Sequence, residues 1–261
     1  MSTSRELAAR AWAETFELID RQLSPLGLRA MDALAPARGS RVVDIGCGAG
    51  QTLLQLADRV GAEGRVTGVD IAPRLLEIAR RRTRELGQVE LILADAQVLD
   101  LPAGGVDAIF SRFGVMAFAD PAAAFANFHR LLKPSGALAF CCWRSLAENE
   151  LDALPVAATG LTAMVDEGPF SFADEGYLRG LLEAVGFGDI AIQAHNEAVS
   201  SGDLDAMVET LLKVGSLGKI IRENPDLRPE AEARLRSALA ARGDPSKVAL
   251  TAAVWIVVAK S

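Results

Sequence analysis

The sequence predicts an α/β protein built on a doubly wound sheet of seven strands. Between Arg41 and Trp143, short apolar segments alternate with amphipathic segments of helical period, which is typical of strands that alternate with helices. The apolar segments have no polar side, as expected of a parallel sheet that helices cover on both faces. A turn with Gly46, Gly48 and Gly50 follows the first strand directly and leads into the first helix of this region.

The composition predicts a single large hydrophobic core and argues against nucleic-acid-binding, membrane-spanning and secreted proteins. Half of the 261 residues are hydrophobic, and a formal net charge of −7 with a pI of about 5.0 argues against a nucleic-acid-binding surface. No apolar run approaches the ~20 residues of a membrane-spanning helix, and the first residues lack the apolar segment of a signal peptide. Cys47, Cys141 and Cys142 lack metal-ligand spacing and suit a reducing compartment. We therefore expect a cytoplasmic protein without a bound metal.

The predicted elements follow one another regularly up to Trp143. Pro73 and Pro121 each open a helix, because proline is tolerated in the first helical turn, and Asp120 precedes the second of these helices as an N-cap. A further helix covers residues 51–60, where the apolar residues fall on one face. The expected strands of this region are 42–45, 65–70, 89–94, 106–111 and 137–143.

The remaining chain supplies the predicted domain organisation. Residues 1–40 read as a helical cap of two helices broken near 24–27, residues 41–198 as the core, and residues 248–261 as the final core strand. Within the core, Asp174 caps a helix and residues 189–196 form a strand. Residues 199–247 are too long and too amphipathic for a plain linker, so we expect a helical insert that serves as a lid. A static helical layer or a homodimer surface is the alternative for this insert.

The glycine turn has the spacing Asp44-x-Gly46-x-Gly48-x-Gly50. A dinucleotide-binding turn would have a glycine where Gln51 stands, and a phosphate-binding P-loop would continue with a lysine that is missing here. An acidic residue directly before the turn is a poor neighbour for a pyrophosphate but a good one for an ammonium or a sulfonium. The turn therefore favours a ligand that carries a positive charge.

At this point the chain resembles a known family. The stretches "VVDIGCGAG", "VTGVDIAP", "LILADAQ" and "FHRLLKPSGALAF" occur in the order and spacing of the class I S-adenosylmethionine-dependent methyltransferases. Within them the chain is similar to the small-molecule branch related to ubiquinone and menaquinone biosynthesis methyltransferases. The resemblance implies a Rossmann-like sheet, mostly parallel with an antiparallel last strand, and S-adenosyl-L-methionine as cofactor with S-adenosyl-L-homocysteine as product.

The resemblance also implies roles for single residues. Asp44 is expected to face the methionine portion of the cofactor, Asp70 to accept from both ribose hydroxyls, and Asp95 to accept from the adenine amino group. The alternative for Asp95 is a simple cap of the following turn. The complete set of expected cofactor-binding residues is Asp44, Gly46, Gly48, Gly50, Asp70, Ile71, Asp95, Ala96 and Ser111.

The acceptor is expected to be a small, largely apolar molecule. The fourth strand is followed by "SRFG", which differs from the motif of methyltransferases that act on amino groups of bases or glutamine. A sulfonium donor is already activated, so the transfer requires no metal, and we identify no general base. His129 is expected to be exposed or to cap its helix, and His195 to have a structural role, with a position facing the pocket as its alternative. Candidate pocket residues, most of which have a plain core role as their alternative, are Arg112, Phe113, Met116, Trp143, Asn149, Phe170 and Phe172.

Two other classes of function stay open from the sequence. The same fold also carries enzymes that do not transfer a methyl group, such as cyclases, which use S-adenosylmethionine as a substrate or as a scaffold. A ligand-binding regulatory protein is the second alternative. The glycine turn does not separate these classes, because all of them require the same cofactor pocket.

Overall fold

The computed structural model describes residues 3–261, without the side chain of residue 3, and divides them into two compact units. The sheet unit contains residues 26–144, 168–195 and 254–261. The helical unit contains residues up to 25, 145–167 and 196–253, so that both units are assembled from segments far apart in the chain. Each unit is described by itself.

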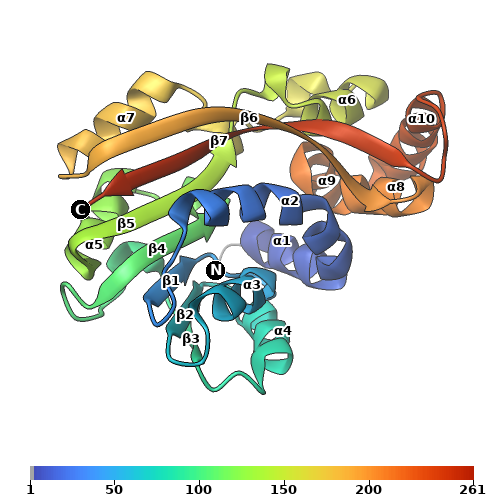
Figure 1. The fold of residues 1–261 in the computed structure, drawn as a ribbon. Coiled ribbons are helices and arrows are strands. Elements are labelled where there is room, and N and C mark those ends of the chain that lie inside the picture. Colours follow the sequence, from blue (N-terminus) through green and yellow to red (C-terminus); the bar gives the residue numbers. More distant parts are fainter. Residues whose placement is uncertain (1–2) are drawn as a thin grey trace. The chain divides into compact units, whose positions relative to one another are not determined.

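The sheet has seven strands in the order β3-β2-β1-β4-β5-β7-β6 (Figure 1). Its strands are β1 (Arg41–Ile45), β2 (Arg65–Asp70), β3 (Val89–Leu93), β4 (Val106–Arg112), β5 (Leu132–Trp143), β6 (Gly188–Gly202) and β7 (Val248–Lys260). Strands β1 to β5 pair in parallel, whereas β7 runs antiparallel to β5, with Ala137 opposite Lys260. The predicted fold class, a mostly parallel seven-stranded sheet with an antiparallel last strand, is confirmed.

The helices of the sheet unit begin where the sequence signals predict. Asp120 accepts a hydrogen bond from the Ala123 N–H at 3.0 Å, and Asp174 accepts one from the Tyr177 N–H at 2.6 Å, so both act as N-caps. The helices are α3 (Gln51–Val60), α4 (Pro73–Thr83), α5 (Pro121–Leu131), α7 (Glu175–Ala184) and the part of α2 (Phe16–Leu34) that follows residue 25. Helix α3 packs on β2 and α4 on β3.

The core of the sheet unit lies around β4, β5 and α5. Phe125 and Phe128 on α5 are fully buried and meet at 5.6 Å between ring centroids, almost perpendicular to each other. Phe140 of β5 lies 5.6 Å from Phe125, and Phe110 of β4 is also fully buried. Burial on this scale fixes the carboxyl ends of β1, β2 and β4, which is where the sequence places the candidate site.

Two strands are several residues longer than the sequence predicts. Strand β5 begins at Leu132 instead of residue 137, because a register shift of the pairing between β4 and β5 accommodates the turn residues, with Ser135 at φ 65°. The Ser135 N–H donates to the carbonyl of Ser261 at 3.0 Å. Strand β6 extends from Gly188 to Gly202, six residues past the predicted end.

The helical unit is built from α1 (Thr3–Glu14), α6 (Glu150–Thr159), α8 (Leu204–Lys213), α9 (Gly215–Glu223) and α10 (Arg228–Ala240). Residues 199–247 are therefore largely helical, as the periodicity predicts. Helix α6 packs on α9 and α10, and α1 packs on α9. The insert's buried apolar side chains include Met207, Val208, Leu211, Leu212, Leu217, Ile220, Ile221, Leu235 and Leu239. The apolar faces of the insert thus find a core within their own unit.

A buried carboxyl joins two helices of the helical unit. Asp152 in the first turn of α6 accepts a hydrogen bond from the Ser216 N–H at 2.7 Å, at the N-terminus of α9. Gly215 has φ 73°, and a Cβ there would lie 2.9 Å from an Asp152 carboxylate oxygen. Burial raises the pKa of Asp152, and the hydrogen bond from Ser216 opposes that shift. The close approach of the Gly215 backbone to this carboxyl is one that only glycine permits.

The N-terminal helices are interrupted at a different place from the predicted one. The prediction of a break near residues 24–27 is wrong: Pro25 lies inside α2, and the interruption falls at Thr15 between α1 and α2. The Thr15 hydroxyl donates to the Ala11 carbonyl at 2.6 Å, a side-chain bond of the kind that bends helices. Proline is the stronger sequence signal for a helix end, but the helix continues through Pro25 and is interrupted at Thr15 instead.

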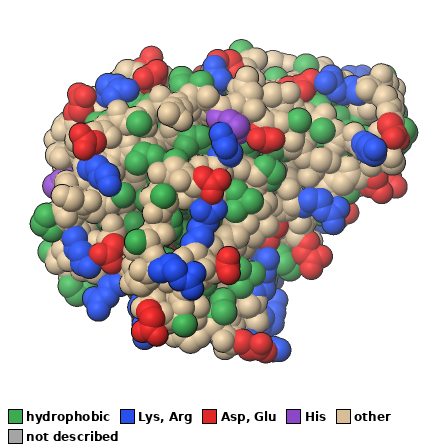
Figure 2. Space-filling view, viewed as in Figure 1, with side chains coloured by type: hydrophobic (Ala, Val, Ile, Leu, Met, Phe, Trp, Pro, Cys, Tyr) green, Lys and Arg blue, Asp and Glu red, His purple; other side chains and the backbone are tan. Residues whose placement is uncertain are grey.

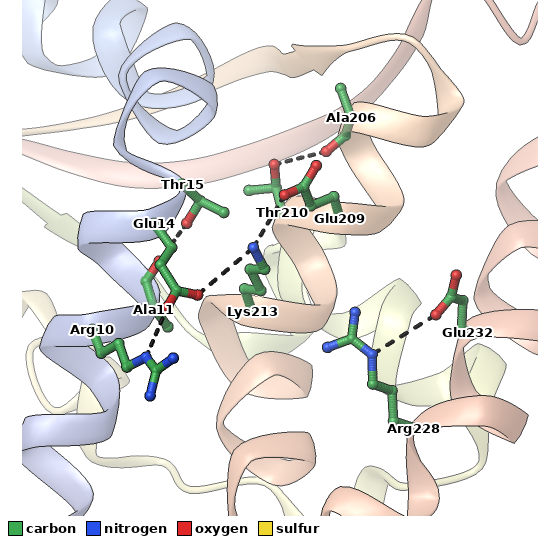
Figure 3. Close-up of polar contacts among 10 residues, drawn as sticks. All are labelled: Arg10, Ala11, Glu14, Thr15, Ala206, Glu209, Thr210, Lys213, Arg228 and Glu232. Carbon is green, nitrogen blue, oxygen red and sulfur yellow. Dashed lines mark hydrogen bonds and ion pairs between the residues drawn. The ribbon is translucent and has the colours of Figure 1, made fainter.

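Figure 3 shows the polar contacts beside this interruption. Glu14 accepts from Arg10 at 2.7 Å within α1 and lies 3.9 Å from Lys213 at the end of α8. Lys213 also pairs with Glu209 one turn earlier, at 3.1 Å. These ion pairs are largely exposed and contribute little each, so the apolar contacts of the helices dominate their packing.

Short 3-10 turns connect the longer elements: η1 (Ala96–Val98), η2 (Gly114–Ala117), η3 (Leu146–Glu148), η4 (Thr162–Met164), η5 (Gly168–Phe170) and η6 (Pro225–Leu227). On the face shown in Figure 2, acidic and basic side chains are interspersed. Within residues 3–261, every helix is too short or too polar to traverse a lipid bilayer.

Candidate functional site

The glycine turn joins β1 to α3 at the carboxyl edge of the sheet. The Gly46 and Cys47 N–H groups both donate to the Val69 carbonyl, at 2.8 and 3.1 Å, which holds the turn against β2. Gly46 has φ 71°, and a Cβ there would lie 2.7 Å from the Gly114 Cα. Gly48 has φ 53°, and a Cβ there would meet nothing within 4 Å. Gly46 is thus required for packing, whereas Gly48 leaves its backbone bare toward open space, as a cradle for a ligand requires.

Asp44, the acidic residue before this turn, is fully buried. One carboxylate oxygen accepts from the Thr52 hydroxyl, and within the described residues the other, Oδ1, has no hydrogen-bond partner. Burial raises the pKa of Asp44 to about 7, and the Thr52 hydroxyl and the Arg112 charge only partly oppose it. Since Oδ1 is also sealed from solvent, Asp44 is placed to act on a nearby cation through its charge.

Asp70 ends β2 and lies directly beside the turn. Its Oδ2 accepts from the Gly48 N–H and its Oδ1 from the Ala72 N–H, both at 2.8 Å. Burial raises the pKa of Asp70, and these backbone donors oppose that shift. Each carboxylate oxygen has a second lone pair, so Asp70 can support the turn and still accept from two hydroxyls of a ribose.

The third strand end presents apolar surface next to Asp70. Asp95 is exposed, and its Oδ1 accepts from the Gln97 N–H at 2.9 Å, so the capping role that the sequence left open is the one observed. Ala96 is buried, whereas Ile71 is 43% exposed. Leu93 and Val98, which no sequence motif singles out, are 58% and 72% exposed. Exposed aliphatic side chains at this edge suit the face of an adenine ring.

Ser111 near the end of β4 is fully buried. Its hydroxyl donates to the Ile45 carbonyl at 2.7 Å and accepts from the Gly114 N–H at 3.0 Å. Ser111 therefore ties the ends of β1 and β4 together, and its predicted contact with the cofactor stays a prediction.

Arg112, Phe113, Met116 and Trp143 gather at the ends of β4 and β5. Phe113 has φ 63° and stacks on Trp143, with 4.0 Å between ring centroids and 21° between the planes. The Trp143 N–H donates to the Met116 sulfur at 3.5 Å. All four side chains are partly exposed. A strained aromatic residue at a strand end is a feature that clusters at functional sites.

The other candidate pocket residues are buried. Phe172 is 1% exposed and belongs to the core around α5, and Phe170 is 7% exposed. Asn149 in the helical unit is fully buried; its Oδ1 accepts from the Ala253 N–H at 2.7 Å and its Nδ2 donates to the Ser145 carbonyl at 3.2 Å. These placements match the core role that was the alternative, and a contact of these residues with an acceptor stays a prediction.

The cysteine side chains and His129 take structural positions. Cys47, Cys141 and Cys142 are free and buried, and burial raises the pKa of each thiol, that of Cys141 to about 12, so they are poor nucleophiles at neutral pH. His129 packs edge-on against Phe187 at 5.2 Å. Among residues 3–261, no three His, Cys, Asp or Glu side chains are arranged to hold a metal ion.

Several residues that shape the site were missed from the sequence. Gln51 accepts a hydrogen bond from the Arg112 guanidinium, and Thr52 donates to Asp44. Gly114 could not carry a side chain, because a Cβ would lie 2.3 Å from the Ile45 carbonyl oxygen. The departure of Gln51 from the dinucleotide pattern was the available signal for the first pair, but its partner lies 61 residues away in the chain.

A separate hollow of about 350 Å³ lies at the opposite edge of the sheet, at the amino ends of β1, β2 and β4. Its lining includes Arg41, Arg65 and Val106. Ligands of open α/β sheets bind outside the carboxyl ends of the strands, so this hollow is not the candidate site.

Comparisons with known proteins agree with this geometry. Residues 42–136 match the family described as "Methyltransferase domain". Aklanonic acid methyltransferase DauC from Streptomyces sp. (strain C5) is 33% identical over 145 residues, which is 53% of this chain and 66% of DauC. Demethylmenaquinone methyltransferase from Staphylococcus epidermidis is 26% identical over 66% of this chain and 77% of its own length. The chain thus spans slightly less than two thirds of DauC.

A solved structure extends the likeness over most of the chain. The YcgJ protein from Bacillus subtilis superposes with a TM-score of 0.60 at 18% identity, over 90% of this chain and 97% of YcgJ, which shows a shared fold. With the family match, the fold and the four sequence stretches, residues 42–136 are a methyltransferase domain of the class I S-adenosylmethionine-dependent methyltransferases. The predicted resemblance and the predicted cofactor are confirmed.

Proposed function

We propose that the whole protein transfers the methyl group of S-adenosylmethionine to a small, largely apolar molecule. The observation that carries the proposal is the turn between β1 and α3, where the bare backbone at Gly48 lies beside the carboxylate of Asp70 and the buried charge site of Asp44. When bound, S-adenosylmethionine supplies a methyl group on a sulfonium that an acceptor nucleophile displaces in line. The relatives named after aklanonic acid and demethylmenaquinone support a small-molecule acceptor.

The residues of this chain contribute binding and orientation. Asp70 would accept from the ribose hydroxyls, Ile71 and Ala96 would flank the adenine with Asp95 near its amino group, and Asp44 would stabilise the positive charge of the methionine portion. Phe113 and Trp143 form a stacked apolar wall that suits an acceptor with little polar surface. None of these groups is assigned as a general base, since alignment and exclusion of water are the main demands of the reaction.

The test has two stages. Calorimetry is expected to show one-to-one binding of S-adenosylhomocysteine; tight binding of NAD with none of S-adenosylhomocysteine would refute the proposal. Mass spectrometry of reactions with a panel of phenolic, carboxylic and amine acceptors is then expected to show a product heavier by one methyl group, with equal formation of S-adenosylhomocysteine. An isomerised acceptor without methylation would instead indicate a cyclase, and binding without turnover a regulatory protein.

Metal independence is a separate expectation. Because the sulfonium donor needs no Lewis acid, a chelator should leave the turnover rate unchanged. Turnover would be measured with and without the chelator, at equal ionic strength. A reversible loss that magnesium restores would contradict the metal-independent displacement.

We also propose roles for the parts of the chain and its surroundings. Residues 41–198 with 248–261 supply the cofactor site, and residues 1–40 and 199–247 act as a cap and lid that exclude water from the acceptor. A cytoplasmic location is supported by three free, buried cysteines. The partner is proposed to be a small molecule and not nucleic acid, in keeping with a net charge of −7, and a homodimer stays a prediction.

A further inference from the structure

Two charged side chains are held by neighbouring residues at the start of α3. Gln51 accepts a hydrogen bond from the Arg112 guanidinium, and Thr52, the next residue, donates to the Asp44 carboxylate. A basic and an acidic group are therefore fixed around the first turn of one helix, directly after the glycine turn. The methionine portion of the cofactor carries one group of each sign, an ammonium and a carboxylate.

The guanidinium of Arg112 is also positioned from a second side. A Cβ added at Gly27 of α2 would lie 2.9 Å from the Arg112 Cδ and 3.6 Å from its Cγ. The missing side chain at Gly27 thus makes room for the aliphatic stem of Arg112. Glycine is less favourable than alanine inside a helix, so its presence here calls for a packing reason, and the stem of Arg112 supplies one.

The charge of Arg112 reaches the glycine turn. It lowers the pKa of Asp44 in opposition to burial, and it acts in the same direction on Cys141, its register partner on β5. Arginine suits a carboxylate because its planar group donates two parallel hydrogen bonds. Asp44 in turn is sealed and offers only its charge, which suits the ammonium.

We propose that Arg112 recognises the carboxylate of the cofactor's methionine portion, and that Gln51 and Gly27 are positioning residues that hold its guanidinium beside the glycine turn. This inference rests on the proposed function, since it assumes that the turn binds S-adenosylmethionine. Arg112 is thereby assigned to the cofactor, whereas the sequence predicts a place for it in the acceptor pocket. Gln51, which stands where a dinucleotide site has glycine, gains a specific role in the choice of ligand.

The test compares two ligands that differ only in the carboxylate. Calorimetry measures the dissociation constants of S-adenosylhomocysteine and of its decarboxylated analogue for the wild type and for Arg112→Gln. We expect Arg112→Gln to weaken the binding of S-adenosylhomocysteine by about 10- to 100-fold, which is the range for a lost charge-assisted hydrogen bond. The dissociation constant of the analogue should change by less than about twofold, since the analogue lacks the carboxylate that Arg112 binds.

Further variants separate recognition from folding. Gln51→Glu keeps Arg112 in place but compensates its charge, and Gly27→Ala displaces its stem while raising helix propensity. Both variants should weaken the binding of S-adenosylhomocysteine more than that of the analogue. The melting temperature should stay unchanged for Gln51→Glu and be unchanged or slightly higher for Gly27→Ala. Arg112→Lys should restore part of the selectivity, because it keeps the charge without the planar group. The matched control is Arg82→Gln, whose guanidinium donates to the Ala49 carbonyl at 3.0 Å in the same turn and should leave the ratio of the two affinities unchanged.

The outcomes are distinct. Equal weakening of both ligands by Arg112→Gln, or no weakening of either, would overturn the assignment of Arg112. An acceptor carboxylate is the other source of the same chemistry, so binding of 2-naphthoate and 2-naphthamide is measured with S-adenosylhomocysteine bound. A loss in Arg112→Gln confined to 2-naphthoate would also overturn the assignment to the cofactor. A wild type that binds neither adenosyl ligand would refute the proposed function itself.

Discussion

At the scale of single residues, Asp70 combines a structural and a binding role. Its carboxylate accepts from the Gly48 and Ala72 N–H groups and lies where ribose hydroxyls are expected. Asp70→Ala should weaken the binding of S-adenosylhomocysteine by about 2–4 kcal/mol, because two charge-assisted hydrogen bonds to the ligand are lost. It should also lower the melting temperature, since two backbone donors lose their acceptor.

Titration calorimetry and thermal unfolding of the same samples check this prediction. Asp174→Ala is the matched control, because Asp174 is an exposed carboxylate that caps α7 through the Tyr177 N–H and has no proposed contact with the cofactor. A dissociation constant for Asp70→Ala within twofold of the wild type would show that the ribose is bound elsewhere.

Asp44 should make the free energy of unfolding depend on pH, with stability falling as the pH rises. Burial raises its pKa to about 7, so the folded protein holds this proton more tightly than the unfolded chain does. The folded state is therefore penalised as pH rises from about 4 to about 7, by an upper limit of about 4 kcal/mol above that range. Asp44→Asn removes this contribution and should gain stability relative to the wild type at pH 8 but not at pH 4.

A second carboxyl with the opposite shift provides the control. Burial opposes ionisation of Asp107, but hydrogen bonds from Lys133 at 2.5 Å and from the Arg41 N–H at 2.8 Å outweigh it and lower its pKa. Its carboxylate stabilises the fold above the unfolded pKa, and that stability is lost as pH falls, so Asp107→Asn should be most harmful at pH 8. Urea unfolding at both pH values measures each difference, and parallel pH profiles for Asp44→Asn and the wild type would contradict the prediction.

At the scale of elements, two glycines of the turn between β1 and α3 have different roles: Gly46 allows close packing, and Gly48 leaves room for a ligand. An added Cβ at Gly46 would overlap the Gly114 backbone, whereas one at Gly48 would enter open space, although both residues have positive φ. Gly46→Ala should therefore destabilise the protein more than Gly48→Ala, for which we expect only the backbone strain of about 1–2 kcal/mol. Both should weaken S-adenosylhomocysteine.

Chemical unfolding and calorimetry of the two variants are the measurements. The informative result is a mismatch between stability and binding: Gly48→Ala should lose affinity out of proportion to its small loss of stability. Unchanged affinity in folded Gly48→Ala would mean that the ligand does not approach this backbone.

The same elements show what the sequence can and cannot predict. Helix α3 and strand β2 begin and end at the predicted residues, and β7 begins at the predicted one, because hydrophobic period and turn residues act locally. Pro25 misled the prediction, since a helix can continue past a proline when its packing is favourable. Burial of Ser111 and Asn149 depends on backbone groups far along the chain, at Ile45 and Ala253, and no local pattern encodes such contacts.

At the scale of the whole molecule, the lid remains to be tested by experiment. The sequence predicts a lid for residues 199–247, because this segment is too long for a plain linker and its helices have apolar faces that must be buried against a partner. The structure supplies another partner for these faces, because α8, α9 and α10 pack with α1 and α6 inside the helical unit. A lid role therefore requires the helical unit to respond as one body to ligand, through the chain positions where the two units join.

Hydrogen exchange distinguishes such a lid from a static layer. Amide exchange is compared by mass spectrometry for the free protein, for the protein with S-adenosylhomocysteine, and for the protein with S-adenosylhomocysteine and an acceptor from the panel. If residues 199–247 and 1–40 close over the acceptor, their exchange should slow only in the last sample, whereas the turn around Gly48 should slow in both ligand-bound samples. The turn serves as an internal control for occupancy. Slower exchange at the turn with unchanged exchange in the helical segments would show that these helices are a permanent layer, because closure must reduce their opening.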